Sequence, residues 1–151
     1  GTDALLACAW APETFKSIVT WAGAPDMMLD GFFSQADYDE ARANGFFVME
    51  FDWRDSLNVS LQWCDDVANT DVLGEFSAGY DGPVLAIAGT QDDTVDPLWS
   101  VKIAAANDND ASRTHFIEGM DHTFNVFAEE DLHSLYEAVD ATGAFFAETL
   151  G

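Results

Sequence analysis

The sequence predicts an α/β fold in which parallel strands are covered by helices, and three observations support this. Segments of strand and helix character alternate along the 151 residues. The segment 83–89 is apolar throughout, as expected of a parallel strand that is buried on both faces. Polar and turn-forming residues follow this segment and the next strand segment, where open parallel sheets place their ligand sites.

The first elements are short. Residues 3–10 carry a small apolar face typical of a helix, which Pro12 ends. The β-branched run of residues 17–21 predicts a strand, which residues 22–25 close.

Residues 27–81 form a less regular, aromatic-rich stretch between two strong strand segments. Residues 35–44 have helical composition up to Gly45, residues 46–53 suit a strand or an apolar hairpin, and residues 65–76 suit a helix. We therefore expect an insertion here rather than a simple crossover connection.

The remaining elements complete the α/β alternation. Residues 98–106 predict a helix, residues 113–117 a strand, and residues 132–150 a long amphipathic helix. A strand as apolar as residues 83–89 should have neighbouring strands on both sides, so we expect further strands of the sheet ahead of Gly1. The chain also opens without an initiator Met or a signal peptide, so its start looks cut.

The charge balance is extreme, with 28 acidic residues against five basic ones and a net charge of −23. Such a surface repels nucleic acid and anionic membranes, and no apolar run reaches the roughly 18 residues of a membrane span. The acidic residues are scattered along the chain. This favours a halophilic surface adapted to high salt over a surface that binds cations or a basic partner.

The two cysteines, Cys8 and Cys64, lie in apolar surroundings and are expected to be buried free thiols, with a disulfide as the alternative. They leave the compartment open, with only a slight preference for the cytoplasm.

A carboxylate follows one strand segment and a histidine follows the next. Asp92 lies three residues beyond segment 83–89, and His122 lies in the loop after segment 113–117. Adjacent parallel strands would bring these loops together. A carboxylate on one imidazole nitrogen fixes the tautomer and leaves the other nitrogen free to deprotonate a nucleophile. In the alternative interpretation, Asp92 caps the following helix and His122 is a turn residue.

The other two histidines are weaker candidates. His115 falls inside a strand, where a core or edge position is expected, and His133 falls on a helix with its side chain in solvent.

These loops resemble a known family. Residues 83–95 are similar to the strand and acid loop of α/β-hydrolases, where Gly-x-x-Asp-x-x-Val holds the triad acid, and residues 116–124 resemble their histidine loop, Gly-x-Asp-His-Thr-Phe. The likeness is greatest to the dienelactone-hydrolase-like group, which includes feruloyl and cinnamoyl esterases and relatives of prolyl-oligopeptidase catalytic domains. Residues 27–81 fall where the esterases carry a small cap over the active site.

The resemblance implies roles for individual residues. Asp92 would be the triad acid and His122 the general base, in the family's order of nucleophile, acid and histidine. Asp93 is the competing acid, but Asp92 has the spacing from Gly89 that the family pattern requires. The activity implied is cleavage of an ester or amide bond in a small-molecule substrate, with no cofactor and no metal.

The sequence departs from the family at the nucleophile. No Gly-x-Ser-x-Gly occurs, whereas the residues from Gly1 onward resemble those that follow the nucleophile turn. The serine would then lie two positions ahead of Gly1, in a missing N-terminal part of the same fold. The chain alone is therefore expected to be inactive.

Aromatic residues of the insertion could line a substrate pocket, although forming the core of the cap or packing the cap on the sheet is the stronger expectation for most of them: Phe32, Phe33, Phe46, Phe47, Phe51 and Trp53.

Two other functions remain open. One is a non-catalytic α/β module, or a subunit completed by a separate N-terminal chain. The other is cation binding by the acidic loops 91–96 or 107–110, although the second lacks the glycine and the terminal Glu of an EF-hand loop.

Overall fold

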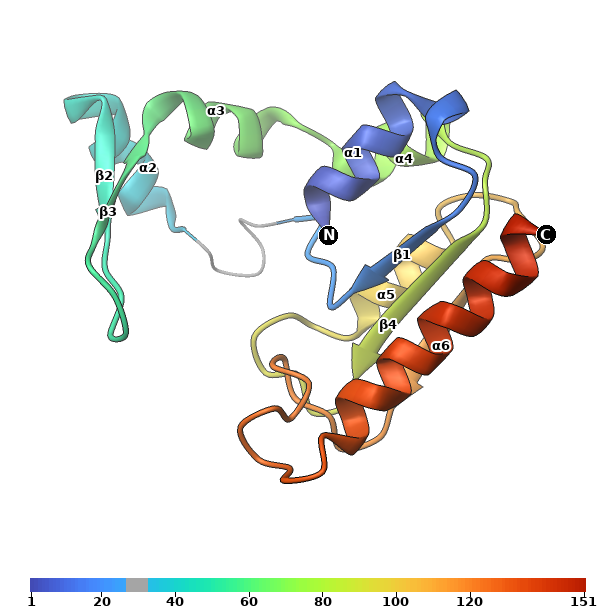
Figure 1. The fold of residues 1–151 in the computed structure, drawn as a ribbon. Coiled ribbons are helices and arrows are strands. Elements are labelled where there is room, and N and C mark those ends of the chain that lie inside the picture. The colour runs from blue at the N-terminus through green and yellow to red at the C-terminus, as the bar shows by residue number, and fades with distance from the viewer. Residues whose placement is uncertain (27–32) are drawn as a thin grey trace. The chain divides into compact units, whose positions relative to one another are not determined.

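The computed structural model describes residues 1–26 and 33–151, which form two compact units (Figure 1). Unit 1 consists of Gly1–Pro25 and Val72–Gly151, and unit 2 of Asp26–Asp71. Each unit has its own hydrophobic core, so the chain folds around more than one centre.

Unit 1 is built on a parallel three-stranded sheet. β4 (Val84–Gly89) lies between β1 (Ile18–Trp21) and β5 (Arg113–Ile117) and runs parallel to both. All six residues of β4 are buried, as the apolar sequence pattern predicts for a strand covered on both faces. The register pairs Ile87 with Trp21 and His115.

Helices cover the two faces of this sheet. Val84 and Ala86 of β4 pack with α1 (Thr2–Trp10), α4 (Val72–Gly79) and α5 (Leu98–Ala104). The alternate residues Leu85 and Ile87 pack instead on α6 (His133–Leu150). Figure 1 shows α6 in front of β4 and α5 behind it. The period-two alternation of a strand thus divides the core of unit 1 into two layers.

Unit 2 is a helix and hairpin around an aromatic core. α2 (Gln35–Asn44) begins with a capping box between Ser34 and Asp37, and ends at Gly45, whose φ of 87° suits glycine. β2 (Phe46–Met49) then pairs antiparallel with β3 (Leu57–Ser60), and α3 (Leu61–Asn69) follows. The buried core residues are Phe33, Tyr38, Ala41, Phe47 and Cys64.

The structure differs from the sequence prediction at the end of the insertion. One helix was expected over residues 65–76, and this is wrong, because α3 ends at Asn69 and α4 starts at Val72. The side chains of Asn69 and Thr70 donate hydrogen bonds to carbonyls of the last turn of α3, and Thr70 takes an extended conformation. α4 belongs to unit 1, and unit 2 ends at Asp71.

The aromatic residues of the insertion divide between core and surface. Phe33 and Phe47 are buried and stack on each other, whereas Trp53 is 78% exposed. Phe46 is partly exposed, and Phe32 lies outside the described residues. Phe33 and Phe47 therefore belong to the core of unit 2, and Trp53 does not.

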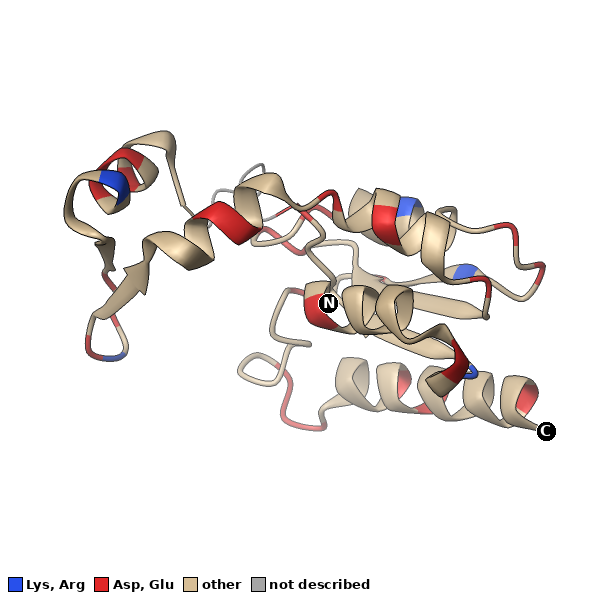
Figure 2. Ribbon diagram, turned by 90° about the horizontal axis from the view of Figure 1, so that it is seen from above, with Lys and Arg blue, Asp and Glu red and all other residues tan. Residues whose placement is uncertain are grey.

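Both cysteines are buried free thiols, Cys8 in unit 1 and Cys64 in unit 2. Burial raises the pKa of each thiol above its usual value. In Figure 2 the positions of acidic residues, coloured red on the ribbon, are spread over the helices and loops of both units. Within the described ranges, no helix combines the length and hydropathy required to cross a membrane.

The charge and the sheet edge lead to a prediction for the isolated chain. In the described sheet β1 pairs with β4 alone, so its other edge offers unpaired backbone groups, and the net charge is −23. We expect the isolated chain to aggregate or fold poorly at low ionic strength. Added NaCl should raise the urea midpoint of unfolding, because the screening length falls to about 10 Å at 0.1 M salt and the repulsion between carboxylates weakens. Sedimentation and urea titration would measure this, with sucrose as the uncharged control. Cooperative unfolding of a monomer near neutral pH without salt would contradict it.

Candidate active site

Asp92 lies in the turn that follows β4. Its Oδ1 accepts backbone N–H groups from Thr94 at 3.0 Å and Val95 at 2.8 Å. Its side chain is fully buried, and its Oδ2 lies 3.0 Å from Nδ1 of His122. The two amides fix the carboxylate, which leaves its second oxygen directed at the imidazole.

His122 lies in the loop that follows β5, and its side chain is 36% exposed. Because Nδ1 faces the Asp92 carboxylate, the favoured tautomer carries its proton on Nδ1 and a lone pair on Nε2. A half-exposed imidazole held in this tautomer is suited to accept a proton from a hydroxyl group.

The two loops are joined by backbone hydrogen bonds. Thr90 N–H donates to the Ile117 carbonyl at 3.0 Å, and Gln91 N–H donates to the Met120 carbonyl at 3.1 Å. In the reverse direction, Gly119 N–H donates to the hydroxyl of Thr90 at 2.9 Å. The separation of Asp92 and His122 is therefore set by the backbone and not by their side chains alone.

Gly89 makes this close approach possible. A Cβ atom at this position would lie 1.9 Å from the Met120 carbonyl oxygen, much closer than van der Waals contact. Met120 is itself fully buried, so it has little room to move. The last residue of β4 must therefore be glycine for the two loops to meet.

The other sequence candidates occupy different environments. Asp93 is exposed, with the Thr94 hydroxyl 3.4 Å from its carboxylate, so the structure brings Asp92 and not Asp93 to the histidine. On β5, His115 contacts Glu137 of α6 at 3.1 Å. His133 is exposed at the start of α6. Of the sequence candidates, the structure therefore brings together Asp92 and His122.

The start of α1 lies against the segment that follows β1. The Thr2 hydroxyl donates to the Ala24 carbonyl, and a Cβ atom on Gly1 would lie 2.6 Å from Cα of Gly23. Gly23 follows the carboxyl end of β1, and the Asp92 and His122 loops follow the carboxyl ends of β4 and β5. In a parallel sheet these ends share one edge, so Gly1 and the acid–histidine pair lie on the same side of unit 1.

The sequence does not predict the hydrogen-bond network around the histidine loop. Asp121 accepts N–H groups from Thr123 and Asn125, and these bonds, the Asn125 one foremost, lower the pKa of Asp121. The side chain of Asn125 reaches Glu129, which in turn holds Ser134 of α6. No motif marks these residues, because each contact depends on the turn that the loop makes.

The network gives a pH-dependent contribution to stability. Hydrogen bonds from the side chain and backbone of Ser134, followed by Asn125, lower the pKa of Glu129 from 4.5 to about 2. A lowered folded-state pKa contributes stability above pH 4.5 that is lost as the pH falls towards 2. Replacing Glu129→Gln should therefore lower the urea midpoint at pH 7, and this deficit should shrink towards pH 2. The exposed neighbour serves as control, because Glu130→Gln should leave the midpoint unchanged at both pH values.

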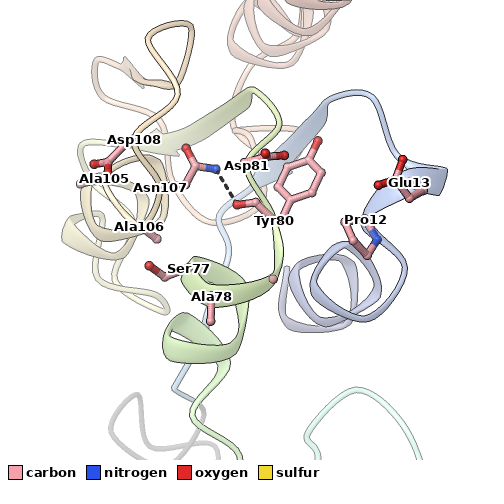
Figure 3. Close-up of a pocket in the computed structure, with 11 residues that line it drawn as sticks. Pro12, Glu13, Ser77, Ala78, Tyr80, Asp81, Ala105, Ala106, Asn107 and Asp108 are labelled. Carbon is pink, nitrogen blue, oxygen red and sulfur yellow. Dashed lines mark hydrogen bonds between the residues drawn. The ribbon is translucent and has the colours of Figure 1, made fainter.

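A hollow of about 510 Å³ lies elsewhere in unit 1 (Figure 3). It is lined by segments 77–81 and 105–108 together with Pro12 and Glu13, and Asn107 donates a hydrogen bond to the Tyr80 carbonyl beside it. Neither Asp92 nor His122 lines it. Among the described residues, no group of three or more His, Cys, Asp or Glu side chains is arranged to hold a metal ion.

Comparison with known proteins identifies the fold. The sequence matches no protein-family model and no curated protein. Est1E from Butyrivibrio proteoclasticus is similar in structure, with 21% identity, a TM-score of 0.69, and coverage of 99% of this chain and 57% of Est1E. A structure of Est1E with bound ferulic acid gives 20% identity, a TM-score of 0.68, and coverage of 99% of this chain and 55% of Est1E.

A third similar structure comes from another organism. It is a protein assigned as a non-heme bromoperoxidase, BpoC from Mycobacterium tuberculosis H37Rv, with 22% identity, a TM-score of 0.65, and coverage of 98% of this chain and 63% of BpoC. Est1E and BpoC both have the α/β-hydrolase fold, so this chain has the fold of the C-terminal part of an α/β-hydrolase. It spans less than two thirds of either protein.

Proposed function

We propose that this chain supplies the acid and the general base of a serine hydrolase that cleaves ester bonds. The observation that supports the proposal is the contact of 3.0 Å between Oδ2 of the buried Asp92 and Nδ1 of the half-exposed His122. If Asp92 only capped the local backbone and His122 were only a turn residue, this contact would not be required. Oδ1 of Asp92 alone accepts the backbone amides of Thr94 and Val95.

The chemistry follows from the tautomer that Asp92 selects. Nε2 of His122 takes the hydroxyl proton of a serine while the serine oxygen attacks the ester carbonyl carbon. The imidazolium then gives this proton to the departing alcohol, which leaves an acyl-serine. Water then attacks the acyl carbon and loses a proton to Nε2, and the acyl–serine bond breaks as the imidazolium returns this proton to the serine oxygen, which releases the acid. Asp92 stabilises the imidazolium in both halves of the reaction without being protonated.

The nucleophile would come from sequence ahead of Gly1. Gly1 packs against Gly23 at the edge of the sheet that carries Asp92 and His122, so a serine two positions earlier would enter at that edge. The N–H of the residue after that serine would supply part of the oxyanion hole. Such a part is compatible with the chain covering 55–57% of Est1E.

The substrate class is proposed as a small ester. The similarity to Est1E, one structure of which contains ferulic acid, makes aryl esters the first probes to try.

A phosphonate probe would test the proposal. The protein produced from its whole coding sequence should be labelled by a fluorophosphonate on one serine, and it should hydrolyse 4-nitrophenyl acetate or methyl ferulate. The 151-residue chain alone should do neither. Absence of both labelling and hydrolysis from the protein of the whole coding sequence would exclude a hydrolase and favour a non-catalytic module.

A further inference from the structure

The loop that carries His122 has a backbone conformation that local preferences alone do not favour. Phe124 and Asn125 both have left-handed backbone angles, with φ of 60° and 53°. Two consecutive residues of this kind, neither of them glycine, persist only where surrounding contacts hold them. The contacts that hold this turn therefore also determine where His122 lies.

Asn125 closes the turn around His122. Its Oδ1 accepts the N–H of Asp121 at 2.9 Å, and its own N–H donates to the Asp121 carboxylate at 2.9 Å. Its Nδ2 donates to the Gly119 carbonyl at 3.3 Å. One side chain thus fixes the residue directly before His122 and Gly119, which lies two residues beyond β5.

Glu129 connects this turn to α6. Its Oε1 accepts Nδ2 of Asn125 at 2.8 Å and the hydroxyl of Ser134 at 2.6 Å, and its Oε2 accepts the N–H of Ser134 at 2.8 Å. Ser134 is buried in the first turn of α6 and contacts Nδ2 of Asn125 at 3.1 Å. α6 in turn packs on β4 and β5, so the connection ends in the core.

A second support comes from Phe124. Its ring lies 4.8 Å from the ring of Trp21, measured between centroids, and the indole N–H of Trp21 donates to the hydroxyl of Thr142 in α6. The turn is therefore attached both to β1 and to α6. The amide of Asn125 and the carboxylate of Glu129 are the polar part of this attachment.

We propose that Asn125 and Glu129 are positioning residues that hold His122 against Asp92. The inference rests on the proposed function for its catalytic consequence, but its structural part stands on hydrogen bonds that are independent of any substrate. It assigns these two residues a role beyond stability, since the turn that they close contains the imidazole and the aspartate that precedes it.

The variants separate the backbone conformation from the side-chain contacts. Asn125→Gly keeps a residue that adopts a positive φ readily but removes the amide. Glu129→Gln keeps the size of the side chain but removes the carboxylate that accepts from Ser134 and Asn125. Glu130→Gln is the control on the same loop.

The direct readout is the imidazole itself, in protein produced from the whole coding sequence and labelled with ¹⁵N-histidine. A downfield Nδ1–H proton resonance that Asp92→Asn abolishes reports the His122–Asp92 hydrogen bond. We expect Asn125→Gly and Glu129→Gln to broaden or remove this resonance, although each variant still unfolds in a cooperative thermal transition. Glu130→Gln should leave the resonance unchanged. Persistence of the resonance in both variants would overturn the inference.

The kinetic readout distinguishes this inference from the proposed function. Displacement of a catalytic group by about 1 Å can cost on the order of 10²-fold in rate, so both variants should lower kcat strongly with little change in KM. Loss of the resonance in a protein that hydrolyses no ester would support the positioning role and reject the hydrolase. Hydrolysis that needs His122 but is unaffected by either variant would keep the hydrolase and reject the positioning role.

Discussion

Replacing His122→Ala in the protein of the whole coding sequence is expected to lower kcat for 4-nitrophenyl acetate by several orders of magnitude. In the proposed mechanism His122 is the base that takes the serine proton, and removal of a triad member leaves only the catalysis due to the oxyanion hole and substrate binding. KM should change little, because the imidazole acts mainly in the transition state. Steady-state kinetics with single-turnover acylation would measure both effects.

Asp92→Asn should reduce kcat nearly as far, by about 10⁴-fold, because an amide in place of the carboxylate favours the wrong tautomer of His122. Asp93→Asn is the matched control, since Asp93 is exposed and one residue away. We expect it to retain nearly full activity. If Asp93→Asn were the crippling change and Asp92→Asn silent, the assignment of the acid would be wrong.

The second large effect is expected from Gly89→Ala. The new methyl group would lie 1.9 Å from the Met120 carbonyl oxygen and 2.5 Å from its carbon, so the loops after β4 and β5 must separate. Overpacking of this kind typically costs about 1–3 kcal/mol and occasionally more, and a backbone clash belongs at the upper end. The free energy of unfolding from urea titration should fall accordingly, and the Nδ1–H resonance of His122 should be lost.

Gly143→Ala is a control for which the free energy of unfolding should change in the opposite direction. Gly143 lies within α6, and a Cβ atom there would meet nothing within 4 Å. Alanine in a helix interior is favoured over glycine by about 0.5–1 kcal/mol, so this variant should be slightly more stable than the natural chain. Equal destabilisation by both substitutions would show that the close approach at Gly89 has no special role.

The sheet and the pairing of the two loops could be predicted because they depend on patterns that a sequence displays. The apolar run in β4 indicates burial on both faces, and the rule for parallel strands then places Asp92 and His122 at one edge. The resemblance to the α/β-hydrolase pattern favours Asp92 over Asp93, and in the structure it is Asp92 that contacts the histidine.

Other features could not be predicted because they depend on contacts that leave no periodic signal. The break between α3 and α4 contains neither Gly nor Pro and depends on side chains of Asn69 and Thr70 that bond to backbone carbonyls. β3 is short and mostly exposed, so its residues show little apolar pattern. The contact between Asn125 and Glu129 exists only once the turn has formed.

The division of the chain into two units separates its hydrophobic cores. Unit 1 is assembled from two stretches of sequence and contains both Asp92 and His122, whereas unit 2 is one uninterrupted stretch with its own core. A substitution in the core of unit 2 therefore removes none of the described contacts that join the Asp92 and His122 loops. Each unit can change its own packing while the packing of the other stays as it is.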